Sequence, residues 1–204
     1  MSQLRCLAVV PLRSFRHGKS RLAIALDSGA RESLTRAMAT RVITTALTVV
    51  PTAVVSADHE VLLYAKELGA MTIAETVTET ENHRRLNSAL HQAAHWAQEH
   101  DYLAQAVIAA DLPLISHNDV VALTRLETSK QLFIATDRNG RGTNAITQSP
   151  PAGIGYRFGT DSLRNHQRAG YAAHFNVTVL DRPGLSFDVD TPDDFAQLQA
   201  RSDP

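Results

Sequence analysis

Short apolar runs that alternate with segments of helical periodicity constrain the fold of this chain more than any other feature. Residues 4–12 form an almost continuously apolar run, as in a strand buried on both faces of a parallel sheet. Residues 31–50 follow with apolar side chains at helical spacing, and Pro51 ends that helix. Further strands are expected at residues 52–56, 70–74, 104–110, 131–136 and 173–180, and further helices at 58–69, 86–100, 118–126 and 160–170. This alternation predicts an open, largely parallel α/β sheet.

The pattern is less regular in the last third of the chain. Residues 137–151 are rich in glycine, proline and polar residues and are expected to be irregular, and residues 183–190 are expected to form a short extended stretch. A final helix has clear start signals, with Thr191 as N-cap and Pro192 at the first helical position. The sequence contains no linker or repeat, so residues 1–204 are predicted to form a single domain.

Composition argues against several classes of function. The 204 residues carry a formal net charge of −1, with basic and acidic residues mixed along the chain, which is not typical of a nucleic-acid-binding protein. No apolar run approaches the roughly 20 residues of a membrane span, and residues 1–3 carry no basic segment of a secretion signal. The single cysteine, Cys6, lies in the first apolar run and is expected to be a buried thiol. We therefore expect a cytoplasmic protein.

Two acidic sites are the strongest candidates for chemistry. Asp188 and Asp190 lie one residue apart in an extended stretch, so their side chains point to the same side. A magnesium ion would neutralise the repulsion between them. Asp111 directly follows an apolar run, at the carboxyl edge where open α/β sheets bind ligands. Simple capping or turn roles are the alternative, although Thr191 already provides the cap. Together the three carboxylates predict a magnesium site.

Four basic residues crowd the loop after the first strand: Arg13, Arg16, Lys19 and Arg21. The sequence around Gly18 resembles a P-loop, but that motif requires a glycine five residues earlier, where Arg13 stands. A solvated loop is the simple alternative. Four cations at a strand–helix edge nevertheless suit a triphosphate, with Lys19 and Arg21 as the predicted contacts.

Two further segments could bind anions. Residues 140–145 match a dinucleotide fingerprint that ends in alanine, but the residues after it cannot form the helix that such a motif requires. The loop still offers backbone N–H groups and the Thr143 hydroxyl. Residues 158–162 begin another helix, whose N-terminus favours an anion. Capping by Thr160 or Asp161 is the simpler explanation for that segment.

These pieces, in this order, resemble the guanylyltransferases of coenzyme F-420 biosynthesis over residues 9–195, nearly the whole chain. The resemblance rests on a set of short motifs: Val10-Pro11-Leu12, Lys19-Ser20-Arg21-Leu22, Leu86-Asn87, Ala110-Asp111-Leu112-Pro113-Leu114, Asp137-Arg138, Gly142-Thr143-Asn144-Ala145, Phe158-Gly159, Ser162, His166 and Asp188-Val189-Asp190-Thr191-Pro192. Each motif alone is weak, whereas the ordered set is specific.

The resemblance implies a compact, Rossmann-like nucleotidyltransferase of the nucleotide-diphospho-sugar transferase (GT-A-like) fold. It implies transfer of GMP from GTP to phosphoenolpyruvate, 2-phospho-L-lactate or 3-phosphoglycerate, with release of pyrophosphate. The cofactor implied is Mg²⁺, and its ligands, which with Lys19 form the expected catalytic group, are Asp111, Asp188 and Asp190. The positions implied for the phosphorylated acid are Thr143, Gly159 and Ser162, and those for the nucleotide are Arg13, Lys19, Arg21 and Asn87.

The chain departs from the family pattern at charged positions. Arg13 stands where the family usually has lysine, which keeps the charge but not the point-like ammonium. Arg84 and Arg85 precede Leu86, and the residue directly before Leu86-Asn87 is typically glycine in the family. The two arginines add positive charge on the nucleotide side.

Two questions stay open at the level of sequence. No residue distinguishes the three acids, and phosphoenolpyruvate is the favoured one. The alternatives to this activity are a transferase for a sugar phosphate, molybdopterin or cobinamide phosphate, and a non-catalytic nucleotide-binding protein. The oligomeric state is not readable either, with a homodimer as one option.

Overall fold

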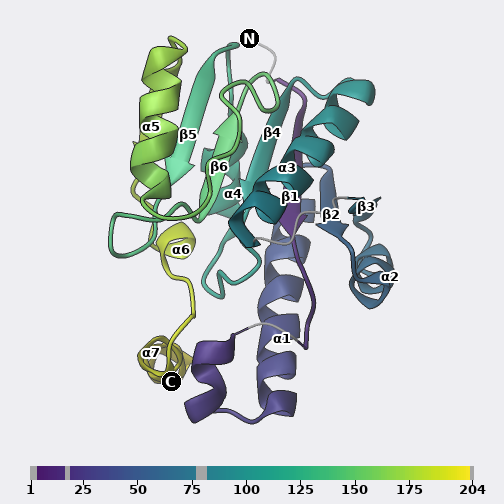
Figure 1. Ribbon diagram of the computed structural model, residues 1–204, viewed down its shortest axis with the longest axis vertical. Coiled ribbons are helices and arrows are strands. Elements are labelled where there is room, and N and C mark those ends of the chain that lie inside the picture. The colour runs from purple at the N-terminus through teal and green to yellow at the C-terminus, as the bar shows by residue number, and fades with distance from the viewer. Residues whose placement is uncertain (1–3, 17–18, 77–81, 203–204) are drawn as a thin grey trace.

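The seven strands of the computed structural model lie in one sheet (Figure 1), in the order β3-β2-β1-β4-β6-β5-β7. The structure describes residues 4–16, 19–76 and 82–202. The strands are β1 (Cys6–Pro11), β2 (Thr52–Ser56), β3 (Met71–Ala74), β4 (Ala104–Ile108), β5 (Gln131–Ala135), β6 (Ala145–Gln148) and β7 (Asn176–Leu180). Strand β6 is antiparallel to β4 and β5, and the other strand pairs of the described chain are parallel. The sheet is therefore mixed but mostly parallel, as predicted.

Helices cover both faces of the sheet (Figure 1). One face packs against α1 (Ser28–Leu47), α2 (His59–Glu67) and α4 (His117–Thr124). The other face packs against α3 (Asn82–Glu99) and α5 (Ser162–Ala172). The shorter or peripheral helices are η1 (Ser20–Ile24), α6 (Pro183–Ser186) and α7 (Pro192–Ser202). The result is a three-layer α/β arrangement, which buries both faces of a parallel sheet.

The first strand shows why its sequence reads as a continuous apolar run. Cys6, Ala8 and Val10 belong to the core on the α1 side, whereas Leu7 and Val9 belong to the core on the α3 side. Both faces of β1 are therefore shielded from water, and no position along the strand needs a polar side chain. Burial raises the pKa of the Cys6 thiol to about 12, so the single cysteine is an inert core residue, as predicted.

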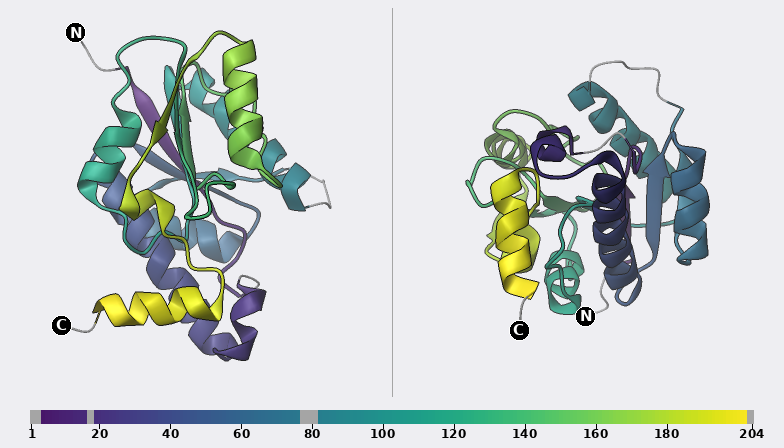
Figure 2. Two further views of the ribbon diagram at one scale, coloured as in Figure 1. Left: turned by 90° about the vertical axis from the view of Figure 1, so that its left-hand side faces the viewer. Right: turned by 90° about the horizontal axis from the view of Figure 1, so that it is seen from below.

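A third apolar cluster joins the two ends of the chain. It contains Leu22 of η1, Met38 of α1, and Phe187 and Val189 from the segment before α7. Figure 2 shows the same arrangement, with α7 beside η1 and the first turns of α1. Because Val189 and Leu22 share this cluster, the neighbouring Asp190 is brought next to the loop that follows β1.

Predictions from local start and stop signals are confirmed. Strand β2 has the predicted bounds. The Asp58 carboxylate caps α2 by accepting the N–H of Glu60 at 2.9 Å. Gly69 adopts a φ of 90° just after that helix, a conformation that glycine reaches without strain. Such signals depend only on neighbouring residues, and this is why they can be read without a tertiary structure.

Three expectations for the last third of the chain are wrong. Strand β6 lies inside the segment expected to be irregular, and all four of its residues are buried between β4 and β5. Residues 183–186 form the helical turn α6 instead of an extended stretch, because Pro183 at the first position has a φ suited to a helix. Residues 187–190 belong to neither a helix nor a strand, and Phe187 has an extended backbone. Strand β7 starts three residues later than expected, because α5 continues to Ala172.

The start of α5 also differs from the simple capping explanation. Asp161 occupies the N-cap position with a φ of 51°, and its side chain makes no capping hydrogen bond. Its carboxylate instead accepts two hydrogen bonds from the Arg141 guanidinium, at 3.1 and 3.2 Å. The helix N-terminus is therefore not capped by the Asp161 side chain.

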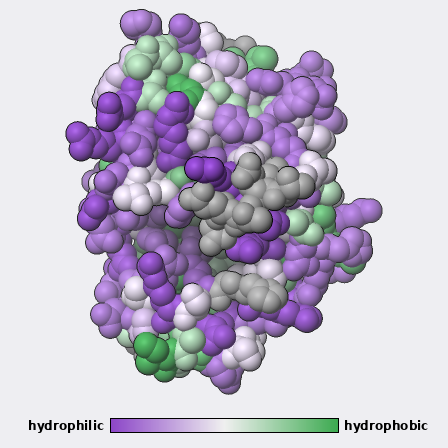
Figure 3. Space-filling view, in the orientation of Figure 1, coloured by the Kyte–Doolittle hydropathy of each residue, from purple (hydrophilic) through white to green (hydrophobic). Residues whose placement is uncertain are grey.

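Polar residues dominate the face of the molecule shown in Figure 3, with hydrophobic residues in small patches. The large hydrophobic side chains that are exposed lie on different elements: Ile24, Leu63, Leu103, Tyr171 and Val179. Among the described helices, none combines the length and the apolar character that crossing a membrane requires.

Candidate active site

A cavity of about 380 Å³ opens at the edge of the sheet where β1 and β4 end. Its wall includes six of the residues predicted to be functional: Asp111, Thr143, Gly159, Ser162, Asp188 and Asp190. The carboxyl ends of parallel strands meet at one edge, which places Asp111 there directly after β4. The ordered motifs of the sequence are therefore gathered around one space.

The antiparallel strand β6 brings Thr143 to this edge. Its first residue, Ala145, pairs with Ile108 near the end of β4 and with Ala135 at the end of β5. Residues 142–144 thus enter the sheet at the edge where the neighbouring strands leave it, because β6 runs in the opposite direction. A parallel strand at this place would have put the same loop at the far side of the molecule.

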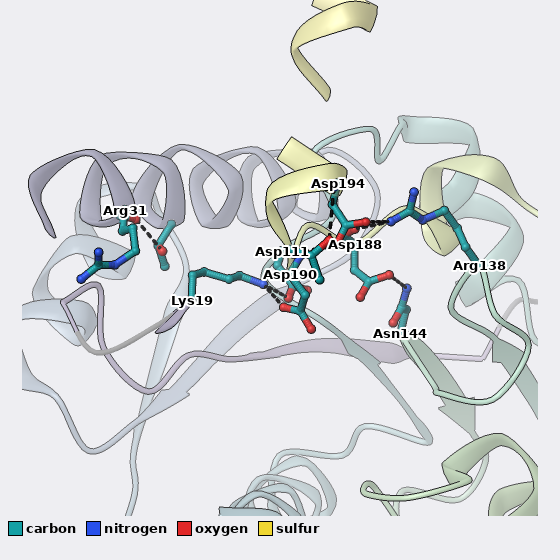
Figure 4. A network of polar contacts seen from close by, with 10 residues as sticks. Lys19, Arg31, Asp111, Arg138, Asn144, Asp188, Asp190 and Asp194 are labelled. Carbon is teal, nitrogen blue, oxygen red and sulfur yellow. Dashed lines mark hydrogen bonds and ion pairs between the residues drawn. The ribbon is translucent and has the colours of Figure 1, made fainter. Parts of the chain in front are cut away.

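Lys19 lies between two of the predicted metal ligands (Figure 4). Its ammonium group bonds Asp111 Oδ2 and, at 2.7 Å, Asp190 Oδ1, and its side chain is only 9% exposed. Burial alone lowers the pKa of Lys19, but the charges and hydrogen bonds of the two carboxylates outweigh it and raise the pKa above its ordinary value. Lys19 is therefore a firmly charged cation that neutralises the acidic cavity.

Asp188, two residues before Asp190, is the third carboxylate of the acidic group formed by Asp111, Asp188 and Asp190. The Asn144 amide donates to its Oδ1 at 3.3 Å (Figure 4). Burial raises the pKa of Asp188, and the negative charges of Asp111 and Asp190 raise it further. The charged form of this carboxylate is thus disfavoured in the cavity until more positive charge arrives.

The fit of a magnesium ion can be judged from these groups. Carboxylate oxygens are the donors that Mg²⁺ prefers, and the raised pKa of Asp188 marks a place that favours added positive charge. Within the part of the chain that the structure describes, however, no three His, Cys, Asp or Glu side chains are already arranged around one point. The space between Asp111 and Asp190 is held by the Lys19 ammonium. The donor chemistry therefore fits, and an ion there requires Lys19 to move aside.

A capping box holds the Asp188–Asp190 segment in place. The Asp194 carboxylate accepts the N–H groups of Asp190 at 2.9 Å and Thr191 at 2.8 Å, and Thr191 Oγ1 accepts the N–H of Asp194 at 3.3 Å. Burial alone raises the pKa of Asp194, but these hydrogen bonds and that of Arg138 outweigh it and lower the pKa. The predicted N-cap at Thr191 is confirmed, and the box fixes the backbone that carries the acidic pair.

Two hydroxyl groups, those of Thr143 and Ser162, also line this cavity. Ser162 Oγ donates to Thr143 Oγ1 at 3.1 Å, and Thr143 Oγ1 lies 3.1 Å from Nδ1 of the buried His166 ring. The other ring nitrogen, Nε2, accepts the backbone N–H of Arg157 at 2.9 Å. Burial, with the Arg157 charge, lowers the pKa of His166 to about 4, so the ring is neutral at pH 7.

The proton of the neutral His166 ring can then be assigned. Because Nε2 accepts a hydrogen bond, Nδ1 carries the proton and donates to Thr143 Oγ1. Thr143 Oγ1 accepts from both His166 and Ser162, so its own proton is directed elsewhere, and the cavity lies beside it. The network therefore orients one hydroxyl proton for an anionic ligand.

Asn87 fixes the loop that contains Phe158 and Gly159. Its side-chain amide donates to the Phe158 carbonyl at 3.1 Å and accepts the Phe158 N–H at 2.9 Å. The next residue, Gly159, has a φ of 133°, which a residue with a side chain would rarely adopt. The observed role of Asn87 is thus to hold this loop, and its predicted contact with the nucleotide stays a prediction.

Two of the four basic residues of the first loop lie near the acidic group. Lys19 bonds Asp111 and Asp190, and the exposed Arg21 lines a neighbouring cavity together with Asp188 and Asp190. Arg13 borders a different cavity near the end of β1. Arg16 is largely exposed and lies 3.4 Å from a carboxylate oxygen of Glu60, away from the site. Lys19 and Arg21 are thus placed near the acidic group, whereas Arg13 and Arg16 border other parts of the structure.

Two residues that the sequence analysis did not select also shape this edge of the sheet. Arg138, besides its pair with Asp194, lies with its guanidinium 4.4 Å from the centre of the Phe187 ring. Glu75 directly follows β3 and lines the same cavity as Arg13. The rule that selected Asp111, a carboxylate at the end of a parallel strand, could have selected Glu75 as well.

Comparison with known proteins identifies the family to which the chain belongs. Residues 6–202 match the family described as "Guanylyl transferase CofC like". A phosphoenolpyruvate guanylyltransferase of Rubrobacter xylanophilus is 35% identical over 196 residues, which cover 95% of this chain and 93% of the relative. A 2-phospho-L-lactate guanylyltransferase of Methanothermobacter thermautotrophicus is 34% identical over 197 residues, which cover 96% of this chain and 84% of the relative.

The fold is shared with proteins of much lower identity. A Desulfovibrio desulfuricans G20 protein described as a nucleotide-diphospho-sugar transferase has a TM-score of 0.79 at 16% identity, covering 98% of this chain and 88% of that chain. This likeness concerns the fold alone, and it confirms the predicted fold class. The family match extends over nearly the whole sequence and bears on activity as well. The chain belongs to the CofC-like guanylyl transferase family and is a nucleotidyltransferase.

Proposed function

We propose that this enzyme transfers GMP from GTP to phosphoenolpyruvate and releases pyrophosphate, as a step of coenzyme F-420 biosynthesis. The observation that carries the proposal is one cavity lined both by Asp111, Asp188 and Asp190 and by the Thr143–Ser162 hydroxyl pair. Lys19 bonds two of these carboxylates. The name of the 35% identical relative supports phosphoenolpyruvate as acceptor. The acids 2-phospho-L-lactate and 3-phosphoglycerate are the alternative acceptors.

The reaction needs no protein nucleophile. A phosphate oxygen of the acid attacks the α-phosphorus of GTP in line, and the bond between that phosphorus and the oxygen bridging to the β-phosphate breaks as pyrophosphate leaves. The main difficulty is that two anions must approach each other, so positioning and charge neutralisation supply the catalysis. An active site of this kind requires cations on one side and anion-binding donors on the other.

We assign the residues of this chain as follows. Asp111, Asp188 and Asp190 would hold Mg²⁺, which supplies charge neutralisation at the phosphates when bound. Lys19, once released from its two carboxylates, is long enough to turn towards the β- and γ-phosphates, with Arg21 as a second contact. Lys19 would thus exchange its two carboxylate partners for phosphate partners, so its positive charge would stay paired with negative charge.

The acceptor would bind beside the hydroxyl pair of the same cavity. The oriented Thr143 hydroxyl, the Ser162 hydroxyl and the backbone N–H of Gly159 would bind its phosphate and hold the attacking oxygen towards the α-phosphorus. The fixed ring of His166 keeps the Thr143 proton pointed at this phosphate. These groups recognise the phosphate that all three candidate acids share, so direct comparison of the acids is needed to identify the acceptor.

The test is incubation of the purified protein with GTP, Mg²⁺ and each acid in turn. Pyrophosphate release and the mass of the guanosine product are measured, and we expect the highest kcat/KM with phosphoenolpyruvate. Release with none of the acids would refute the proposal. Chelation of Mg²⁺ is expected to abolish turnover.

The metal assignment has its own variants. Asp188→Asn and Asp190→Asn are expected to fold with an unchanged circular dichroism spectrum and to lose turnover by about a hundredfold or more. Asp181→Asn, at an exposed carboxylate after β7, is the matched control and should retain its activity. Near-wild-type rates in either site variant at saturating Mg²⁺ would exclude these carboxylates as ligands.

A further inference from the structure

A second cavity lies beside the acidic one, on the α3 side of β1. Its volume is about 250 Å³, and its wall is formed by Pro11, Leu12, Arg13, Val55, Glu75, Arg85, Leu86 and Ala89. Pro11 and Leu86 also line the acidic cavity, so the two spaces adjoin. One ligand can therefore extend from the second cavity to the carboxylates that are proposed to act on phosphates.

The size and the walls of this second cavity suit a flat ring system. Whole small-molecule ligands occupy about 300–1,000 Å³, so 250 Å³ corresponds to one part of a nucleotide and not to all of it. Most of the wall is apolar, including Leu12, Val55 and Ala89, which are buried in the core. An aromatic base gains from such walls on both of its faces.

One buried carboxylate interrupts the apolar wall. The Glu75 side chain is only 7% exposed, and its Oε1 accepts a hydrogen bond from Arg85 Nε at 2.6 Å. Its backbone N–H donates to the Ser56 carbonyl at 2.8 Å, which fixes the residue at the end of β3. The other carboxylate oxygen accepts no hydrogen bond from the described residues. This oxygen is not fully buried, and Glu75 lines the cavity, so a ligand there can donate a hydrogen bond to it.

We propose that this second cavity binds the guanine base of the nucleotide and that Glu75 reads its Watson–Crick edge. Guanine presents N1–H and a 2-amino group side by side, and a carboxylate, which only accepts, pairs with both. The Arg85 guanidinium, which only donates, faces the acceptor O6. Adenine presents an unprotonated N1 and no 2-amino group, so it would leave Glu75 without donors. This assignment rests on GTP as the nucleotide of the proposed function.

The pair also explains the departure from the family pattern at Arg85. The arginine is not an additional free cation on the nucleotide side, because Glu75 holds its Nε. The competing explanation is that the ion pair only ties the end of β3 to α3. The two explanations predict different binding. If the pair is purely structural, changing the groups on the purine ring should not change nucleotide affinity through Glu75.

The test measures binding, with Mg²⁺ and without any acid, by isothermal titration calorimetry of the full chain. The nucleotides are GTP, ITP (which lacks the 2-amino group), XTP (which has a 2-oxo group) and ATP. Wild type is expected to bind GTP about tenfold to a hundredfold more tightly than ITP, the range of one charge-assisted hydrogen bond. XTP and ATP should bind more weakly than ITP. Equal affinities for GTP, ITP and ATP would overturn the proposal without any variant.

Glu75→Gln provides the decisive comparison. Its amide oxygen can still accept N1–H, but its amide N–H₂ group meets the 2-oxo group of XTP instead of the 2-amino group of GTP. We expect the GTP-to-ITP preference to disappear and XTP affinity to rise at least tenfold. Glu99→Gln on the exposed side of α3 is the control and should keep the wild-type order. An unchanged GTP-to-ITP ratio in Glu75→Gln would show that the pair is only structural.

These results separate the two proposals. Guanine-selective binding without pyrophosphate release would refute the proposed reaction and leave the base site standing. Guanylyl transfer with a Glu75→Gln variant that still prefers GTP over ITP would leave the reaction standing and refute the base site.

Discussion

The buried His166 ring is expected to make the folded protein less stable in mild acid. Its side chain is fully buried, and its pKa falls from an ordinary 6.5 to about 4 because of burial and the nearby Arg157 charge. Between these two values the unfolded chain binds a proton at this residue and the folded chain does not. Protonation therefore favours the unfolded state, and the stability present above pH 6.5 is lost as the pH falls towards 4.

The size of this effect follows from the pKa difference. A shift of one unit corresponds to about 1.4 kcal/mol, so the fall from 6.5 to about 4 corresponds to about 3 kcal/mol of unfolding free energy. This is a large share of the roughly 5–15 kcal/mol that stabilises a typical domain. The His166 contribution should therefore be visible in an ordinary unfolding experiment.

The assay is urea unfolding followed by circular dichroism between about pH 7.5 and pH 4.5. His166→Gln keeps an acceptor for the Arg157 N–H but cannot be protonated in this range. We expect the variant to be less stable than wild type at pH 7.5 and its disadvantage to shrink by about 2–3 kcal/mol on acidification. His95→Gln, whose side chain is 75% exposed, is the control and should follow the wild-type pH dependence.

Two results would refute this reasoning about His166. Parallel stability curves for wild type and His166→Gln across the pH range would show that the ring is not held neutral. A nitrogen NMR spectrum with the proton on Nε2 at pH 7 would show that the hydrogen-bond assignment to Thr143 is wrong.

Two further predictions concern the acidic group and its support. Lys19→Met removes the ammonium between Asp111 and Asp190, so Mg²⁺ alone should raise the melting temperature more in the variant than in wild type. Turnover of the variant should fall about a hundredfold. Equal melting-temperature shifts in scanning fluorimetry would contradict the placement of Lys19. Asp194→Asn weakens the capping box and the Arg138 pair and should cost about 1–2 kcal/mol at pH 7. Because the pKa of Asp194 is lowered in the folded state, its stabilisation is present above the ordinary aspartate pKa and is lost as the pH falls through the lowered value. The difference in unfolding free energy between wild type and variant, measured by chemical denaturation, should therefore vanish in strong acid.

Local signals predicted most of the elements that carry the site. The N-caps at Thr191 and Asp58 each depend on residues three positions apart or fewer, and both are present as expected. Asp111 was selected from its position after an apolar run, and it lies at the predicted edge of the sheet. These signals work because a strand end or a helix start is set by its immediate neighbours.

Strand β6 was missed because it has no such signal. Its four residues lie between segments rich in glycine, proline and polar residues, and a run of four is too short to show a period. Its stability comes from β4 and β5, which pair with it on both sides and lie at distant positions in the chain. The helical turn at residues 183–186 did have a local signal, Pro183 at its first position, but a single turn is too short to show helical periodicity. Leu185 in this turn is buried in the core.

The sequence by itself determined the chemical groups of this protein and the local geometry of each: a pair of carboxylates on one side of an extended segment, a capped helix after it, and a carboxylate at the end of a buried strand. Only the tertiary structure decided which groups meet. Lys19 and Asp190 are 171 positions apart, and they touch because Leu22 and Val189 share one apolar cluster. Thr143 faces the carboxylates because one strand of the sheet runs backwards. The physical reason is that side-chain periodicity records which face of an element is buried, whereas strand order and direction are set by contacts between elements far apart in the chain.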